Sequence, residues 1–274
     1  MKIFLTGASG FVGKNFARLA IKNGCFIYAP TRKNKKIKIK NLKWLRGDFD
    51  LDWKKELLDS DILVHLAASD LRATDSKEIY ETNIFKSINL LKNSIKYKCK
   101  KWLIISTSSE YGLKKKDRCI KFSKQTNRIP EDDYGLSKAI FTDSCINLAK
   151  KFNCRARIMR IFPVYGVGEN KKRLYPSLLK AAKKGNNFFI KNPYETRDFT
   201  NVKFVSKVLF DAMNFNKNFF KSHQVWHVSE NKPYLIKSFI KKYWNIYDAK
   251  GKLILNNKSP VAFNHISDKS SVWL

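Results

Sequence analysis

The sequence lacks any apolar run long enough to cross a bilayer, and it has few cysteines, prolines and glycines. Its 274 residues include 5 cysteines, 7 prolines and 11 glycines. A membrane-spanning helix needs about 20 consecutive apolar residues, so no membrane partner is expected.

The cysteines are odd in number and scattered, which favours reduced thiols in a cytoplasmic compartment over a disulfide framework. The 4 histidines show no ligand spacing, so no metal site is expected. No signal peptide is expected either, because the first residues lead directly into a strand-like segment.

Acidic residues are also scarce. There are 23 of them against 55 lysines and arginines, which gives a formal net charge of +32. Strong basicity is typical of proteins that bind nucleic acid or anionic lipid. Here the lysines are spread along the whole chain, and the densest run, Arg32–Arg46, is typical of a solvated face between two strands. We therefore expect no nucleic-acid partner, and we expect the charge to steer small anionic substrates toward the protein.

The residues that are present predict an α/β fold. Apolar runs of strand length at 2–7, 26–30, 42–48, 61–68, 101–109 and 154–162 alternate with helical patterns at 11–24, 77–98 and 132–152. This alternation predicts a Rossmann-type, doubly wound parallel sheet with helices on both faces. After residue 162 the pattern becomes irregular, with loops expected at Pro163, Pro176 and Pro193. We predict a dinucleotide-binding domain over 1–162 and mainly a smaller substrate-binding lobe over 163–274, with some segments returning to the sheet.

A glycine-rich turn lies between the first strand and the first helix. The segment TGASGFVG places three glycines three residues apart. Glycine is needed where the backbone bends sharply and where a pyrophosphate approaches too closely for a side chain, and the helix N-terminus then offers free N–H groups. The turn therefore predicts a dinucleotide site formed by Gly7, Ser9, Gly10, Phe11, Val12 and Gly13.

The glycine spacing and several later segments resemble the extended short-chain dehydrogenase/reductase family, particularly its nucleotide-sugar epimerases, dehydratases and reductases. The segments are DILVHLAA (61–68), YETNIFKSINLL (80–91), ISTSSEYG (105–112), RIFPVYG (160–166) and RDFTNV (197–202). The resemblance implies further cofactor contacts from Asp48, Phe49, Leu66, Ala67 and Ala68. It also implies a homodimer that pairs through the two long helices.

The end of the second strand selects between the two nicotinamide cofactors. An NAD enzyme places a carboxylate there for the ribose hydroxyls, whereas an NADP enzyme needs cations for the 2′-phosphate. This chain has no acid there and instead has Thr31, Arg32 and Lys33. Since a guanidinium can hold a phosphate with two hydrogen bonds, NADP(H) is favoured, and NAD(H) stays possible.

The spacing Tyr-x-x-x-Lys, which the family uses for catalysis, occurs at three tyrosines: Tyr97, Tyr111 and Tyr134. The first straddles the end of a helix and the start of a strand, and the second lies in a loop before Gly112. Only Tyr134 and Lys138 lie in a sustained helical stretch, where residues four apart share one face. The context therefore favours Tyr134 and Lys138 as the catalytic pair.

The chemistry of ketone reduction explains these residue types. Hydride addition requires a proton on the developing alkoxide, and a tyrosine, with an ordinary pKa of about 10, needs a nearby ammonium to lower that value. Lys138 would do this for Tyr134, and the resemblance implies that it also bonds the nicotinamide ribose. Thr107 matches the family's catalytic Ser/Thr and would hydrogen-bond the same substrate oxygen.

The choice of reaction stays open between two alternatives. The family's dehydratases follow the Thr with an Asp-Glu pair, where this chain has Ser108 and Ser109. Glu110 is one position later and, on a strand, would face the other way, so dehydration is not expected. The lack of an acid at the end of the second strand favours NADPH, and therefore a reductase over a nucleotide-sugar 4-epimerase. The reductase would act on a nucleotide-activated keto sugar, such as a 4-keto-6-deoxyhexose for surface polysaccharide.

The resemblance implies substrate contacts from Ser108, Ser109, Tyr165 and Arg197. A rival is a non-catalytic member that uses the dinucleotide fold to bind RNA or a protein.

Overall fold

A seven-stranded parallel sheet forms the centre of the molecule. The computed structural model describes residues 1–33, 39–69, 75–112, 121–215, 223–256 and 264–273. The strands lie in the order β12-β7-β5-β4-β1-β2-β3. Their bounds are β1 (Lys2–Thr6), β2 (Phe26–Thr31), β3 (Leu42–Arg46), β4 (Ile62–His65), β5 (Lys101–Thr107), β7 (Arg155–Ile161) and β12 (His223–Val228). The predicted Rossmann-type fold class is confirmed, and the carboxyl ends of the strands share one edge.

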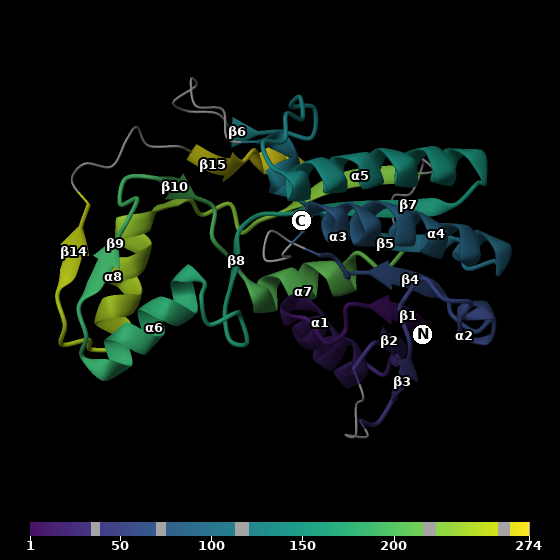
Figure 1. The fold of residues 1–274 in the computed structure, drawn as a ribbon, viewed down its shortest axis with the longest axis horizontal. Helices are drawn as coiled ribbons and strands as arrows, with labels where there is room; N and C mark the ends of the chain where they lie inside the picture. The colour runs from purple at the N-terminus through teal and green to yellow at the C-terminus, as the bar shows by residue number, and fades with distance from the viewer. Residues whose placement is uncertain (34–38, 70–74, 113–120, 216–222, 257–263, 274) are drawn as a thin grey trace.

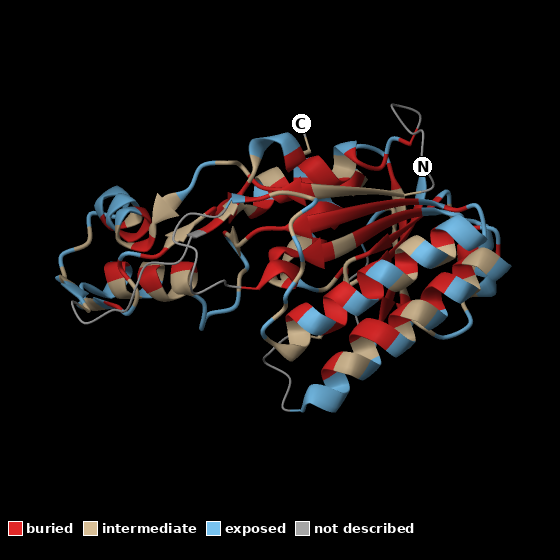
Figure 2. Ribbon diagram, turned by 90° about the horizontal axis from the view of Figure 1, so that it is seen from above, coloured by how far each residue is buried: buried red, intermediate tan, exposed pale blue. Residues whose placement is uncertain are grey.

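Helices cover both faces of this sheet, as Figure 1 shows. On one face lie α1 (Phe11–Lys22) and α7 (Val202–Asp211), and on the other α2 (Lys54–Leu58), α4 (Ser87–Lys96) and α5 (Asp133–Lys151). In β1, Ile3 and Leu5 pack toward the first group and Phe4 toward the second, as strand alternation requires. Figure 2 shows the buried residues concentrated on the central strands. None of the described helices is both long and apolar enough for a bilayer span.

The predicted helix over 77–98 is divided into three parts. It begins as α3 (Ser76–Tyr80), widens into the π-helical segment η1 (Glu81–Lys86) and continues as α4. A π-helical turn inside a helix is often found at a functional site, because it redirects side chains. Here η1 carries Asn83, whose contacts are given below.

A smaller lobe is built from segments after residue 162. It contains α6 (Leu174–Lys184), α8 (Ile236–Ile246), and the paired strands β9 (Phe188–Ile190) and β14 (Leu253–Leu255). A four-stranded sheet, β13 (Tyr234–Leu235), β10 (Thr196–Arg197), β15 (Asn264–Ser267) and β6 (Lys121–Phe122), and the pair β8 (Val164–Tyr165) and β11 (Thr200–Asn201) connect it to the central sheet region. The lobe has a separate aromatic core that includes Tyr175, Phe199, Phe239 and Trp244.

The predicted loop at Pro176 is wrong. Pro176 lies in the first turn of α6, where the missing backbone N–H would have no intrahelical partner. The helical segment α7 and the strand β12 also follow residue 162, and they pack in the Rossmann half rather than in the smaller lobe. Four cysteines, Cys25, Cys99, Cys145 and Cys154, are free and buried, and Cys119 lies outside the described residues.

Candidate active site

The glycine turn is shaped by close backbone contacts. Gly7 has a φ of +70°, and a Cβ there would lie 2.7 Å from the backbone N of Ala67. A Cβ on Gly13 would lie 2.0 Å from the carbonyl oxygen of Gly7, so α1 can approach β1 only with glycine at this position. The exposed Gly10 is the N-cap of α1 and supplies no capping side chain. The free N–H groups at the start of α1, beside Ser9, Phe11 and Val12, therefore fit the pyrophosphate of a dinucleotide.

A buried hydrogen-bond chain joins the end of β1 to the end of β4. The backbone N atoms of Leu66 and Ala67 donate to Thr6 Oγ1 at 3.2 and 3.1 Å. Thr6 Oγ1 lies 2.7 Å from His65 Nδ1, and His65 Nε2 lies 3.0 Å from Ser87 Oγ. Burial lowers the pKa of His65 to about 3, so its imidazole is neutral. This chain fixes the loop that begins at Leu66, Ala67 and the exposed Ala68 beside the glycine turn.

The residues predicted to select the cofactor lie at the end of β2. Thr31 is buried and is the last residue of the strand, whereas Arg32 and Lys33 are exposed. The rest of the basic run is described only in part, because residues 34–38 lie outside the described residues. The exposed cations can reach a phosphate in solvent without breaking any buried contact.

Asp48 lies at the same edge and is partly neutralised. Burial opposes its ionisation, but hydrogen bonds from Lys86 Nζ at 2.6 Å and from the backbone N of Phe49 at 2.8 Å lower its pKa overall. Phe49 is buried against the ring of His65, with ring centroids 5.3 Å apart. Phe49 therefore lies beside the end of β4, and Asp48 directly precedes it.

Asn83 connects the loop after β4 to the helix α5. Its side chain accepts a hydrogen bond from the backbone N of Ser69 and donates to Ser69 O, both at 2.8 Å. It also donates to Ser137 Oγ at 3.0 Å. Since Ser137 directly precedes Lys138, Asn83 couples the cofactor edge to the helix that carries the predicted catalytic pair.

The predicted catalytic residues lie where β5 ends and α5 begins. Thr107 is the last residue of β5 and the N-cap of the 3-10 turn η2 (Ser108–Tyr111), with Oγ1 accepting from Ser109 N at 3.1 Å. The helix α5 starts against this turn, since a Cβ on Gly135 would lie 2.6 Å from Ser109 O. Tyr134, which precedes Gly135, is half-buried in the first turn of α5. The fold thus brings both elements to the same edge of the sheet as the glycine turn.

Lys138 is one turn further along α5 and is buried. Burial lowers the pKa of its ammonium to about 8, although the negative charge of Glu110 opposes that shift. A lysine with a pKa this close to neutrality can respond to a change of charge beside it. Of the competing tyrosines, Tyr97 donates to Asp52 Oδ2 at 2.8 Å on another part of the surface, and Lys115 after Tyr111 lies outside the described residues.

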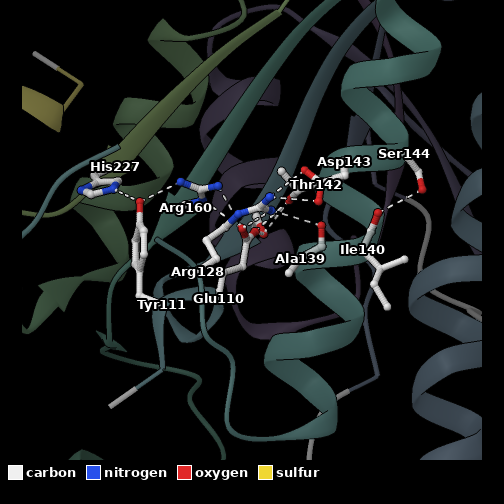
Figure 3. A network of polar contacts seen from close by, with 11 residues as sticks. Glu110, Tyr111, Arg128, Ala139, Ile140, Thr142, Asp143, Ser144, Arg160 and His227 are labelled. Atoms are coloured by element: carbon white, nitrogen blue, oxygen red, sulfur yellow. Dashed lines mark hydrogen bonds and ion pairs between the residues drawn. The ribbon is translucent and has the colours of Figure 1, made fainter. Parts of the chain in front are cut away.

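Glu110 is fully buried at the centre of a charged network, shown in Figure 3. Its carboxylate accepts hydrogen bonds from Ser106 Oγ, from Thr142 Oγ1 at 2.7 Å and from Arg160 Nε at 3.1 Å. Arg128 forms a further ion pair with it at 3.2 Å. The oxygens of Glu110 are therefore committed to structural partners.

The same network extends to both sides of Glu110. Arg128 also donates to Ala139 O at 3.2 Å and to both carboxylate oxygens of Asp143, so it binds the middle of α5. Arg160 donates to Tyr111 Oη at 2.7 Å, and this oxygen lies 2.7 Å from His227 Nε2. The arrangement ties α5, β7 and β12 to the turn after Thr107.

The expectation that Glu110 lies on a strand is wrong. β5 ends at Thr107, and Ser108, Ser109 and Glu110 lie in a 3-10 turn, so strand alternation does not determine which way they face. Glu110 is instead kept from contacting a substrate because its carboxylate is buried and paired with Arg160 and Arg128.

Two of the predicted substrate residues, Tyr165 and Arg197, line a cavity of about 120 Å³ in the smaller lobe. Arg197 Nε donates to Glu195 Oε1 at 2.7 Å, and Tyr165 Oη accepts from Tyr243 Oη at 2.9 Å. The other lining residues are Pro163, Val164, Glu169, Arg173, Leu174, Tyr175, Phe199 and Phe239. Ser108 and Ser109 lie instead at the β5 edge, so the predicted substrate contacts fall into two groups.

Sequence reasoning overlooked several residues of this region. Asn83 was visible only as a polar residue within a helical pattern, and its role depends on the π-helical turn. Glu110 was noticed in the sequence, but nothing near it in the chain indicates that its partners are Arg128 and Arg160. Glu169, which lines the cavity, carries no local sequence signal.

Known proteins resemble this chain in sequence and fold. It is 31% identical over 191 residues to a UDP-glucose 4-epimerase of Vibrio cholerae, covering 67% of this chain and 57% of that protein. It is 28% identical over 189 residues to a CDP-abequose synthase of Salmonella typhimurium, covering 66% and 59%. The matched regions thus span less than two thirds of these relatives.

The solved structure of a UDP-glucuronic acid 4-epimerase from Bacillus cereus, in complex with UDP-glucuronic acid and NAD, has the same fold. It superposes with a TM-score of 0.85 at 24% identity and covers 98% of this chain and 91% of its own. The sequence profile of the family described as "NAD dependent epimerase/dehydratase family" matches residues 3–225. Because this match includes most of the chain, the protein belongs to the NAD dependent epimerase/dehydratase family, within the extended short-chain dehydrogenases/reductases that its motifs resemble.

Proposed function

We propose that the protein reduces a nucleotide-activated keto sugar with NADPH, in the synthesis of a surface polysaccharide. The observation that carries the proposal is the convergence of three features at one sheet edge: the glycine turn, the Thr107 turn and the start of α5. A 4-keto-6-deoxyhexose bound through its nucleotide diphosphate is the substrate that we expect.

The cofactor, when bound, supplies the hydride. Tyr134 then donates its phenolic proton to the alkoxide oxygen that forms on the sugar, and Thr107 Oγ1 donates a hydrogen bond to the same oxygen. Lys138 favours the phenolate that Tyr134 becomes, because its ammonium is an opposite charge on the same helix face. Arg197 holds the diphosphate by charge-assisted hydrogen bonds.

The choice of NADPH rests on the end of β2. Thr31 stands where an NAD enzyme needs a carboxylate, and the exposed Arg32 and Lys33 offer cations for a 2′-phosphate. A reductase consumes reduced cofactor in each turnover, and NADPH is the natural donor for that role. Reduction also requires no second acid–base pair, in agreement with the engagement of Glu110 by the buried Arg160 and the partly buried Arg128.

The direct test is an assay of the purified protein with UDP-, CDP-, GDP- and dTDP-linked 4-keto-6-deoxyhexoses. We expect oxidation of NADPH, followed as loss of absorbance, with at least one of them and a slower rate with NADH. Absence of NADPH oxidation with every keto sugar, together with interconversion of two non-keto epimers, would contradict the proposal.

A second candidate is a nucleotide-sugar 4-epimerase that uses tightly bound NAD. The Vibrio cholerae relative is named as such an enzyme, and the Bacillus cereus structure contains NAD. An epimerase returns its hydride to the sugar, so it would interconvert epimers without added NADPH. The same assay, with product analysis by NMR, separates this candidate from the reductase.

We also propose that two copies pair through α4 and α5. Exposed apolar side chains lie on or beside this surface: Phe85, Leu136 and Ile140. Light scattering that gives the mass of a monomer at micromolar concentration would contradict the pairing.

A further inference from the structure

Glu169 has a buried carboxylate oxygen that pairs with none of the described residues. Its side chain is only 9% exposed, and its Oε2 makes no hydrogen bond within the described part of the chain. Its other oxygen lies 3.8 Å from Arg173 Nε, which is too long for a hydrogen bond. A buried acceptor without a donor costs about 1–3 kcal/mol, so a group that leaves Oε2 unpaired needs an explanation.

Glu169 faces the cavity that contains Tyr165 and Arg197. The loop that carries it follows β8 and also approaches the cofactor half, since a Cβ on Gly168 would lie 3.9 Å from the ring of Phe11. Phe11 is the first residue of α1, directly after the glycine turn. The loop that carries Glu169 therefore borders both the cavity and the start of α1.

We propose that Glu169 is a specificity residue, which accepts a hydrogen bond from a hydroxyl or amino group of the bound sugar and disfavours sugars that carry a carboxylate. The proposal deepens the function proposed above and rests on it. It assigns the substrate to neutral or amino sugars and excludes uronic acids.

The charges around Glu169 support this selectivity. Four other polar side chains line the described walls of the cavity: Arg173, Arg197, Tyr165 and Tyr175. Arg173 forms a long ion pair with Glu169 at 3.8 Å and is 67% exposed, so solvent screens its charge. Arg197 is paired with Glu195 and holds the diphosphate in the proposed function, so a second carboxylate beside Glu169 would gain little from either cation. Two carboxylates that share one site cannot both ionise, so a uronic acid could bind only if one of them took up a proton.

The pH dependence of this exclusion follows from the state of Glu169. Burial raises the pKa of its carboxyl to about 7. At pH 6 the protonated carboxyl can donate to a uronate, whereas at pH 8 the ionised carboxylate repels it and still accepts from a hydroxyl. The preference for a neutral sugar should therefore increase as the pH rises through 7.

The test measures the Kd of two matched pairs, UDP-glucose with UDP-glucuronic acid and GDP-mannose with GDP-mannuronic acid, at pH 6 and pH 8 by calorimetry. We expect the wild-type protein to bind the neutral member of a pair at least about tenfold more tightly at pH 8, a difference of about 1.4 kcal/mol, and less so at pH 6. Glu169→Gln should lose most of the preference and its pH dependence. Glu81→Gln, the same change at an exposed site on η1, should retain both.

Three outcomes contradict the inference. Equal affinity for both members at pH 8 in the wild type, a preference that does not change with pH, or a preference that survives in Glu169→Gln would each exclude selection by this carboxylate. A protein that binds none of the four nucleotide sugars also contradicts the inference, whereas the proposed function fails only if no keto sugar is reduced in the NADPH assay described above. A melting curve for each variant shows that the compared proteins are folded.

Discussion

The candidate site residues at the edge of the central sheet and those around the cavity of the smaller lobe have their polar atoms paired to different degrees. In the cofactor half, Thr6, His65, Asn83 and Glu110 each have their hydrogen-bonding atoms engaged by the protein. In the smaller lobe, a cavity carries the unpaired oxygen of Glu169. The polar atoms of the first group are paired before any ligand binds, whereas Glu169 Oε2 can still accept a hydrogen bond from a ligand.

This difference shows where specificity can vary. The pyrophosphate is the same in NAD and NADP, so a rigid edge of backbone N–H groups suits it. The sugar differs between members, and a cavity can change its choice of ligand with one side chain. Four substitutions test this contrast, and loss of the proposed acid should have the largest effect.

Tyr134→Phe removes the proposed acid from the fixed half without changing the packing. We expect turnover of the keto sugar to fall by about 10²–10⁴, because proton donation to the alkoxide is lost, while NADPH still binds. The control is Tyr97→Phe, which loses a hydrogen bond to Asp52 and about 1 kcal/mol of stability but no activity. Unchanged turnover in Tyr134→Phe would show that another group supplies the proton.

Glu110→Gln breaks the buried network beneath the catalytic turn. It leaves the guanidinium groups of Arg160 and Arg128 without their shared carboxylate, so we expect a loss of about 3–5 kcal/mol in the free energy of unfolding. Urea denaturation measures this loss. Glu56→Gln, which removes a surface pair with Lys43, should cost at most about 1 kcal/mol. Equal losses in the two variants would refute the central place given to Glu110.

Arg32→Glu tests the choice of cofactor at the end of β2. We expect NADPH affinity to fall about 10–100-fold, since a charge-assisted hydrogen bond is replaced by repulsion, and NADH affinity to change much less. Fluorescence titration with both cofactors gives the ratio, and Arg18→Glu on the exposed side of α1 is the matched change of charge. If both cofactors weaken equally, Arg32 does not read the 2′-phosphate.

The smallest effect concerns the unpaired carboxyl of the smaller lobe. The pKa of Glu169 is raised from 4.5 to about 7 in the folded protein, so the native state holds an extra proton between these values. Its contribution to stability is fully present below pH 4.5 and is lost as the pH rises through 7, and between pH 5 and pH 7 the loss is about 2 kcal/mol. Urea denaturation at pH 5 and pH 7 should show a smaller difference in Glu169→Gln than in Glu81→Gln. An identical difference in both would mean that Glu169 titrates normally.

Particular residues show how far sequence reasoning reaches. The glycine turn and the strand–helix alternation were readable because they depend on neighbours within a few residues. Pro176 was misread as a loop residue, since a proline is compatible with both a loop and a first helical turn. The helix over 77–98 was recognised, but its π-helical turn was not, because a hydrophobic pattern does not record one extra residue in a turn.

The parallel sheet, the glycine turn at Gly7–Gly13 and the helical setting of Tyr134 and Lys138 can be predicted from the sequence. These features depend on local backbone geometry and on the period of apolar residues. Two features are visible only in the folded protein: the contact of Glu110 with Arg160, 50 residues away, and the lack of a partner for Glu169 Oε2 among the described residues. Such pairings depend on which distant segments the folded core brings together, and no short stretch of sequence contains that information.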